Sequence, residues 1–95
     1  MANLEYFNIK IDRSKETKDV VIKGEVSNRT EKSYSTIALR IMVFVKNISI
    51  ANVVVLINGL PIGATKAFEK SVEGLEYDNI AKDITRYEIY TESAY

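Results

Sequence analysis

Four acidic residues lie close together in the last third of the chain: Glu73, Glu76, Asp78 and Asp83. Calcium prefers several carboxylate and carbonyl oxygens supplied by flexible loops, and the segment from 73 to 83 shows no regular periodicity. The spacing does not match an EF-hand loop, and no Asp-x-Asp pair occurs. We therefore interpret these acids as solvated loop charges, with a weak calcium site as the alternative, and we predict no cofactor.

Nucleophilic chemistry has few candidate residues. The chain has no histidine and no cysteine, which removes the commonest general base, thiolate nucleophiles and zinc–thiolate sites. Serine–lysine catalysis needs a lysine of lowered pKa in a pocket, whereas Ser14-Lys15 and Lys32-Ser33 both fall in predicted turns. We predict that the chain is not an enzyme.

Six tyrosines are many for 95 residues. Exposed aromatic side chains mark recognition surfaces, and they can also stack on sugars or single-stranded nucleic acid. Alternation along the last predicted strand places Tyr87 on the core face, which favours a packing role. The four interaction candidates are Tyr6, Tyr34, Tyr77 and Tyr90, and ordinary packing at strand edges is the alternative for each.

The charges balance, with 13 basic and 13 acidic residues. Nucleic-acid-binding domains and polybasic membrane-surface modules usually carry a basic surplus. Outward positions of the predicted strands hold Lys10, Lys23, Arg40 and Lys46, but Glu25 interrupts this stripe. We therefore predict no nucleic-acid partner.

The longest unbroken apolar runs, 41–45 and 53–57, are far shorter than the roughly 20 residues that a membrane-spanning helix needs. No basic segment followed by an apolar stretch opens the chain, so we expect no signal peptide and no membrane span. The sequence leaves two possibilities for the compartment: the cytoplasm, or export as part of a longer protein.

Period-two alternation predicts strands near residues 4–12, 20–27, 35–46, 48–57, 64–72 and 84–92, with a helical turn near 77–82. Phe7, Ile9 and Ile11 should share the core face of the first strand. Gly24 should mark a bulge or a close backbone approach. The apolar run 53–57 has lost alternation, which is typical of a strand buried on both faces.

Turn residues separate these strands. Asn47 should adopt positive φ in a tight turn after the third strand. Asn58-Gly59 should end the fourth strand in a turn that Pro61 and Gly63 extend. The 27 β-branched residues and the strand spacing of about ten residues favour an all-β fold. We predict one domain, residues 1–95, folded as an immunoglobulin-like antiparallel β-sandwich of about six or seven strands, with a small barrel as the alternative.

Three segments together resemble the FxLYD family of small immunoglobulin-like domains of bacteria and archaea. They are Gly24-Glu25-Val26-Ser27-Asn28-Arg29-Thr30, the apolar run Ile41 to Val45, and the turn from Leu60 to Phe68. The final acid of the name-motif is Val45 here, and the proline of the turn is displaced to Pro61. The resemblance spans about residues 20–90, and it implies placement in cell-envelope or secreted proteins without catalytic residues.

These observations predict a non-catalytic interaction or spacer module. An edge strand, the first or the last, should pair with a protein partner or with a second copy of the chain. Two different functions stay open. A module that binds calcium, a glycan or a lipid would need a concave aromatic-lined pocket, and an oligonucleotide-binding barrel would need a continuous basic face and a closed strand order.

Overall fold

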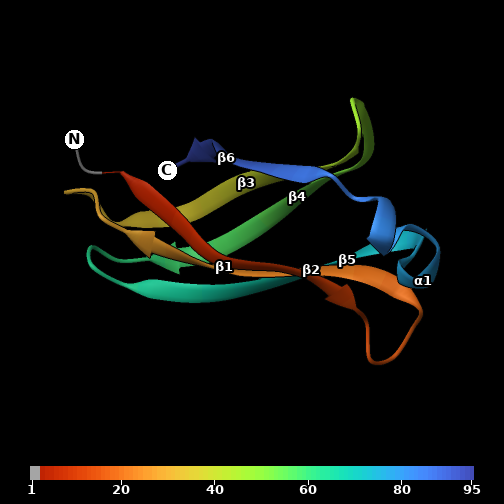
Figure 1. Ribbon diagram of the computed structural model, residues 1–95. Helices are drawn as coiled ribbons and strands as arrows, with labels where there is room; N and C mark the ends of the chain where they lie inside the picture. Colours follow the sequence, from red (N-terminus) through yellow and green to blue (C-terminus); the bar gives the residue numbers. More distant parts are fainter. Residues whose placement is uncertain (1–2) are drawn as a thin grey trace.

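The computed structural model describes residues 3–95 and consists almost entirely of β-strands (Figure 1). Residues 1 and 2 of the predicted 1–95 domain lie outside the described residues. The elements, in chain order, are β1 (Leu4–Arg13), β2 (Asp19–Asn28), β3 (Tyr34–Val45), β4 (Ile48–Leu60), β5 (Thr65–Glu76), α1 (Tyr77–Ile80), a 3-10 turn (Ala81–Asp83) and β6 (Arg86–Ala94).

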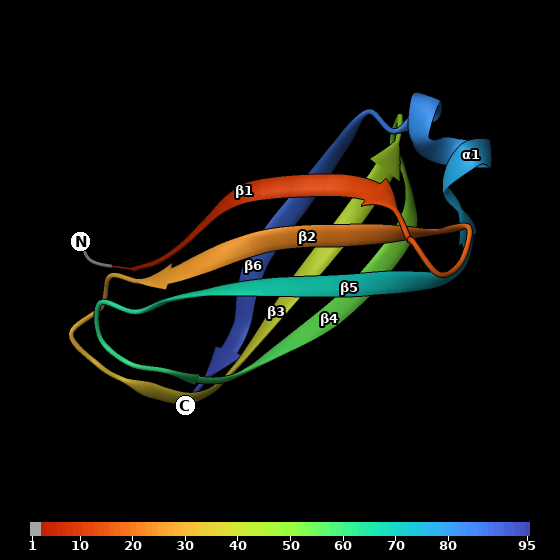
Figure 2. The ribbon, with the colours of Figure 1, turned by 90° about the horizontal axis from the view of Figure 1, so that it is seen from below.

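The strands form two antiparallel three-stranded sheets that pack face to face. Sheet A has the order β1-β2-β5, and sheet B has the order β4-β3-β6. The strands of the two sheets cross at an angle, and α1 closes one end between the layers (Figures 1 and 2). The predicted all-β sandwich is therefore confirmed, and the two central strands, β2 and β3, leave β1, β5, β4 and β6 as edges.

The core lies between the sheets and is almost purely aliphatic. Branched side chains dominate because two facing pleated sheets accept stiff, compact residues well. Fully buried members of this core are Val20, Ile22, Val26, Ile37, Leu39, Ile41, Val43 and Leu60.

The prediction that Phe7 lies on the core face of β1 is wrong. Asn8 has a φ of 53°, and the β1–β2 register shifts between Phe7 and Lys10. This bulge inserts an extra residue and reverses the alternation, so Leu4 and Tyr6 face inward before it while Ile9 faces inward after it. Phe7 is turned outward and is 37% exposed.

The close approach predicted at Gly24 is confirmed. Gly24 pairs with Phe68 across β2 and β5, and a Cβ atom on Gly24 would lie 2.6 Å from Phe68 Cζ and 2.5 Å from Ile9 Cδ1. Because Gly24 has no side chain, Phe68 and Ile9 can pack directly against the backbone of β2. The bulge in β1 lies opposite Gly24.

Strand β4 runs further than the sequence predicts. Leu60 still pairs with Tyr34, so Asn58-Gly59 does not end β4, and the turn falls at Pro61-Ile62-Gly63. Gly63 has a φ of 79°, as the third position of a type II turn requires. In the tight turn after β3, Lys46 rather than Asn47 takes the positive φ, at 56°.

Asn28 is fully buried at the end of β2 and joins two turns. Its Nδ2 donates hydrogen bonds to the backbone oxygens of Lys32 (2.8 Å) and Leu60 (2.9 Å). Its Oδ1 accepts from the backbone N–H (2.9 Å) and the hydroxyl (2.6 Å) of Thr30. The asparagine that carried the family resemblance thus holds the β2–β3 turn against the β4–β5 turn.

Candidate protein-interaction surface

The outward face of sheet B carries apolar and aromatic side chains across all three strands. Along β3, the core residues alternate with outward ones, and register places the outward residues of β4 and β6 beside them. We call this surface the sheet-B face. It consists of Ala38, Arg40, Met42, Phe44, Asn52, Val54, Leu56, Arg86, Glu88, Tyr90 and Glu92.

Arg40 ties the three strands of this face together. Its Nε donates a hydrogen bond to Glu92 Oε1 on β6 (2.8 Å), and its Nη1 donates to Asn52 Oδ1 on β4. The ion pair is partly open to water, so its contribution to stability is small, about 0–1 kcal/mol. Its structural effect is to hold a planar guanidinium in place between apolar neighbours.

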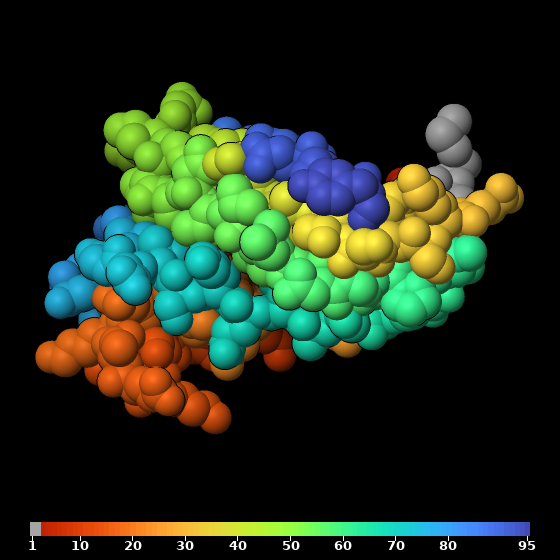
Figure 3. Space-filling view, turned by 180° about the vertical axis from the view of Figure 1, so that it is seen from behind, coloured from red at the N-terminus to blue at the C-terminus, as the bar shows by residue number. Residues whose placement is uncertain are grey.

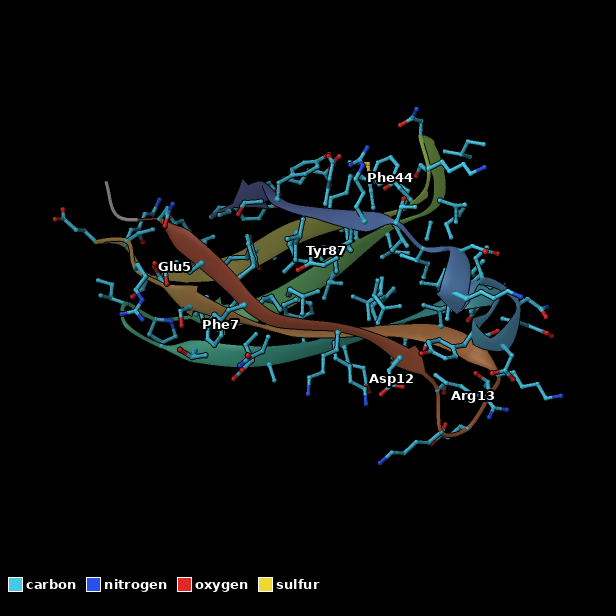
Figure 4. All side chains as sticks on the ribbon, in the orientation of Figure 1. Glu5, Phe7, Asp12, Arg13, Phe44 and Tyr87 are labelled. Atoms are coloured by element: carbon cyan, nitrogen blue, oxygen red, sulfur yellow. The ribbon has the colours of Figure 1, made fainter. Side chains whose placement is uncertain are left out.

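Aromatic residues flank this network. The guanidinium carbon of Arg86 lies 3.8 Å from the centre of the Phe44 ring, and Phe44 projects from the outer side of sheet B (Figure 4). Tyr90, also on β6, is 43% exposed. Tyrosine, phenylalanine, methionine and arginine are the residue types enriched at protein interfaces.

The expectation that residues 53–57 are buried on both faces is wrong. Val55 and Ile57 are buried, but Leu56 is 62% exposed and Val54 is half-buried. The reason is topological, because β4 is an edge strand and its outer face lies on the outside of the sandwich. In Figure 3, the green side chains of β4 form a continuous band along this side of the molecule, next to β5.

Four residues of this face were not predicted as interaction candidates: Leu56, Val54, Met42 and Phe44. For Leu56 and Val54, one signal is present in the sequence, because no charged residue occurs between Lys46 and Lys66. Such an uncharged run predicts that its residues are buried, either in the core of the fold or in an interface. Only the order of the strands in the sheet distinguishes these two cases.

The outward face of sheet A has a different character. Lys23 forms an ion pair with Glu69 (3.6 Å), and Asn8 Nδ2 donates a hydrogen bond to Glu25 (2.6 Å). Lys10 is exposed on the neighbouring strand. These groups satisfy one another and the solvent, so the middle of sheet A presents a hydrated face, and Phe7 is its exposed aromatic residue.

The four tyrosine candidates do not gather at one site. Tyr6 is half-buried on β1 and hydrogen-bonds Thr91 of β6. Tyr34 begins β3, with Lys32 Nζ 5.6 Å from its ring centre. Tyr77 begins α1, half-buried, and its N–H donates to Lys18 O (2.8 Å). Tyr90 alone belongs to the sheet-B face.

Tyr87 faces the space between the sheets, as its alternation predicts, since it pairs with the buried Val43 (Figure 4). It is nevertheless 43% exposed, because β6 is an edge strand and the sandwich is open on that side.

The four acids do not lie in one loop. Glu73 and Glu76 are on β5, which continues past Gly74 by a kink at a φ of 81°. Asp78 lies in α1, where its carboxylate is 3.8 Å from Arg13 Nε, and Asp83 lies in the 3-10 turn. Within residues 3–95, no three acidic side chains are arranged to hold a metal ion.

The strands of residues 3–95 do not form the closed barrel that an oligonucleotide-binding fold would need, because the two sheets stay separate. The four basic candidates divide between sheet A, sheet B and the β3–β4 turn, so they form no continuous stripe.

A glycan or lipid would need a concave pocket lined by aromatic residues, and the nearest equivalent in this structure is an open and mainly polar hollow. An open hollow on sheet A has one aromatic wall residue, Phe68, among mainly polar neighbours. The hollow is lined by Asn8, Lys10, Lys23, Gly24, Glu25, Ala67, Phe68 and Glu69.

Among the described residues, no helix is both long enough and apolar enough to cross a membrane. Comparisons of the chain with protein-family models, curated proteins and solved structures found no match. The FxLYD-like pattern therefore stays a prediction that rests on the residues themselves.

Proposed function

We propose that this domain is a non-catalytic interaction module that binds a protein partner through sheet B. The observation that carries the proposal is the contrast between the two outer faces. Both faces carry ion pairs, Lys23–Glu69 on sheet A and Arg40–Glu92 and Arg86–Glu88 on sheet B, but the sheet-B face also places Met42, Phe44, Leu56 and Tyr90 around its charged groups. Protein interfaces are enriched in aromatic residues, methionine and arginine, which are the types that Phe44, Tyr90, Met42 and Arg40 supply here.

We also propose that the sandwich is immunoglobulin-like. The order β1-β2-β5 corresponds to strands A, B and E of that fold, and β4-β3-β6 corresponds to C′, C and F. The setting that we propose is a cell-envelope or secreted protein. Its support is the FxLYD-like residue pattern in residues 20–90.

A photoreactive phenylalanine analogue placed at single positions tests the proposed function. At Leu56, on the sheet-B face, illumination in extract of the source cells should give a discrete protein adduct. At Glu69, which is exposed on sheet A, the same analogue should give none. Equal labelling at both positions, or no adduct at Leu56, would contradict a role for sheet B in binding.

A further inference from the structure

Three of the four edge strands carry features that prevent pairing with another strand. β1 has the bulge at Asn8, and β6 carries three charges with a register shift beside Glu92. β5 points Lys66 and Lys70 toward the inner side of the sheet, opposite the buried Val26 and Ile22. Bulges and inward-pointing charges on edge strands are established devices against unwanted pairing.

β4 lacks these devices over its middle section. The register shift between Val43 and Phe44 disturbs β4 near Ile50, and Lys66 Nζ donates a hydrogen bond to Asn58 O (2.7 Å). Between these points, residues 51–57 contain no charge, no proline and no glycine. We call residues 51–57 the open segment. Short apolar segments of this composition pair readily through their backbones.

We propose that the open segment pairs antiparallel with the open segment of a second copy of this chain. The proposal rests on the proposed function, and it names both the edge and the partner. Val54 is the middle residue of the segment, so a twofold axis beside Val54 pairs all seven residues, whereas any shift along the strand leaves some unpaired. The result is one continuous sheet of two sets of β4-β3-β6.

The chemistry of the segment indicates an uncharged apolar strand as its partner. It offers no ionic group to a charged peptide, and a charged partner strand would lose hydration beside Val54 and Leu56 without compensation. β4 itself is such a strand, and self-pairing brings no like charges into opposition. The chain's net charge of zero adds no long-range repulsion between copies.

The size of the contact indicates how tight the dimer is. Seven paired residues span about 23 Å of strand, and a contact only one strand edge wide covers far less than the roughly 1,200–2,000 Å² of surface that stable interfaces bury. The dimer should therefore form reversibly, with its population rising as the protein concentration rises.

A single introduced cysteine tests the register, because the chain has no cysteine of its own. In Val54→Cys, the two sulfurs face each other across the axis, and directly opposed residues of antiparallel strands lie about 4.5–5.5 Å apart at Cα, within disulfide range. Mild oxidation should link this variant about tenfold faster or more than Tyr90→Cys, the matched control on β6 of the same face.

A charge introduced at the edge tests the segment independently. Leu56→Lys should weaken self-association by about tenfold or more, because a lysine on an edge strand opposes pairing. Ile62→Lys is the control, since Ile62 is 57% exposed in the β4–β5 turn and lies outside the segment. Circular dichroism should show both variants folded.

Two results would overturn the inference. The first is a chain that stays monomeric at millimolar concentration. The second is a dimer whose affinity is unchanged by Leu56→Lys and in which Tyr90→Cys forms the disulfide as fast as Val54→Cys. In either case, a partner adduct at position 56 in cell extract would still support the proposed function, so the two failures are distinguishable.

Discussion

The hydroxyl groups of Tyr6 and Thr91 form a hydrogen bond that joins the two sheets at the side where the sandwich is open. Tyr6 is on β1 and Thr91 on β6, which are edge strands of different sheets and 85 residues apart in the chain. The bond closes this side between β1 and β6, while Lys66 and Asn58 make the corresponding contact between β5 and β4. Each open side of the sandwich thus has a polar contact between the sheets.

Replacing Tyr6 by phenylalanine keeps the packed ring and removes this bond. We expect a loss of about 0.5–1.5 kcal/mol in the free energy of unfolding, the usual net value for one hydrogen bond. Urea unfolding of Tyr6→Phe, Thr91→Val and the double variant measures the coupling between the two residues. Strictly additive losses would show that the two hydroxyls do not interact.

The stability of the fold should depend on pH through Tyr6. Burial raises the pKa of the Tyr6 phenol above its ordinary value of 10.0, and the hydrogen bond with Thr91 partly opposes this. The folded state therefore favours the neutral phenol, so this contribution is complete below pH 10.0 and is lost as the pH rises through the folded pKa. The stability difference between the wild-type chain and Tyr6→Phe should shrink over that range, and a constant difference would contradict the burial.

Gly24→Ala should destabilise the sandwich by about 1–3 kcal/mol, because its methyl group would overlap Phe68 and Ile9. Thermal or urea unfolding measures this loss. Combining the change with Phe68→Leu should cost less than the sum of the single changes, since the smaller side chain makes room. If Gly24→Ala is neutral, Phe68 does not close over β2 as described.

Asn28→Asp should cost about 2–4 kcal/mol at neutral pH. The aspartate keeps the shape of the side chain but loses both amide donors, and it places a buried charge beside the backbone oxygens of Lys32 and Leu60. Asn47→Asp, in the exposed β3–β4 turn, is the control and should change stability by less than about 0.5 kcal/mol. Equal effects at the two positions would argue against the buried network.

The sequence predicts the number of strands and their positions along the chain well, because alternation reports local burial at every second residue. It fails where one residue alters the backbone. The bulge at Asn8 exposes Phe7, and the kink at Gly74 extends β5, so Glu73 and Glu76 lie on a strand. Neither the bulge nor the kink changes the number of apolar residues in its segment, so the alternation pattern alone does not reveal either of them.

The candidate surface was less predictable than the fold for a related reason. An uncharged run such as residues 53–57 has the same composition whether it lies in the centre of a sheet or at its edge. Strand order depends on contacts between distant segments, and here it places β3 in the centre and β4 outside. Leu56 therefore became visible as a surface residue only in the assembled sandwich.

The central claim is that the β4 edge is an interaction surface that a second copy of the chain can occupy. Sedimentation equilibrium of the wild-type chain and of Leu56→Lys, from micromolar to millimolar concentration, tests it most directly. We predict that the average mass of the wild-type chain rises from that of the monomer toward twice that value, while Leu56→Lys stays near the monomer. A monomer mass for the wild-type chain at every concentration, or equal association of both proteins, would contradict the claim.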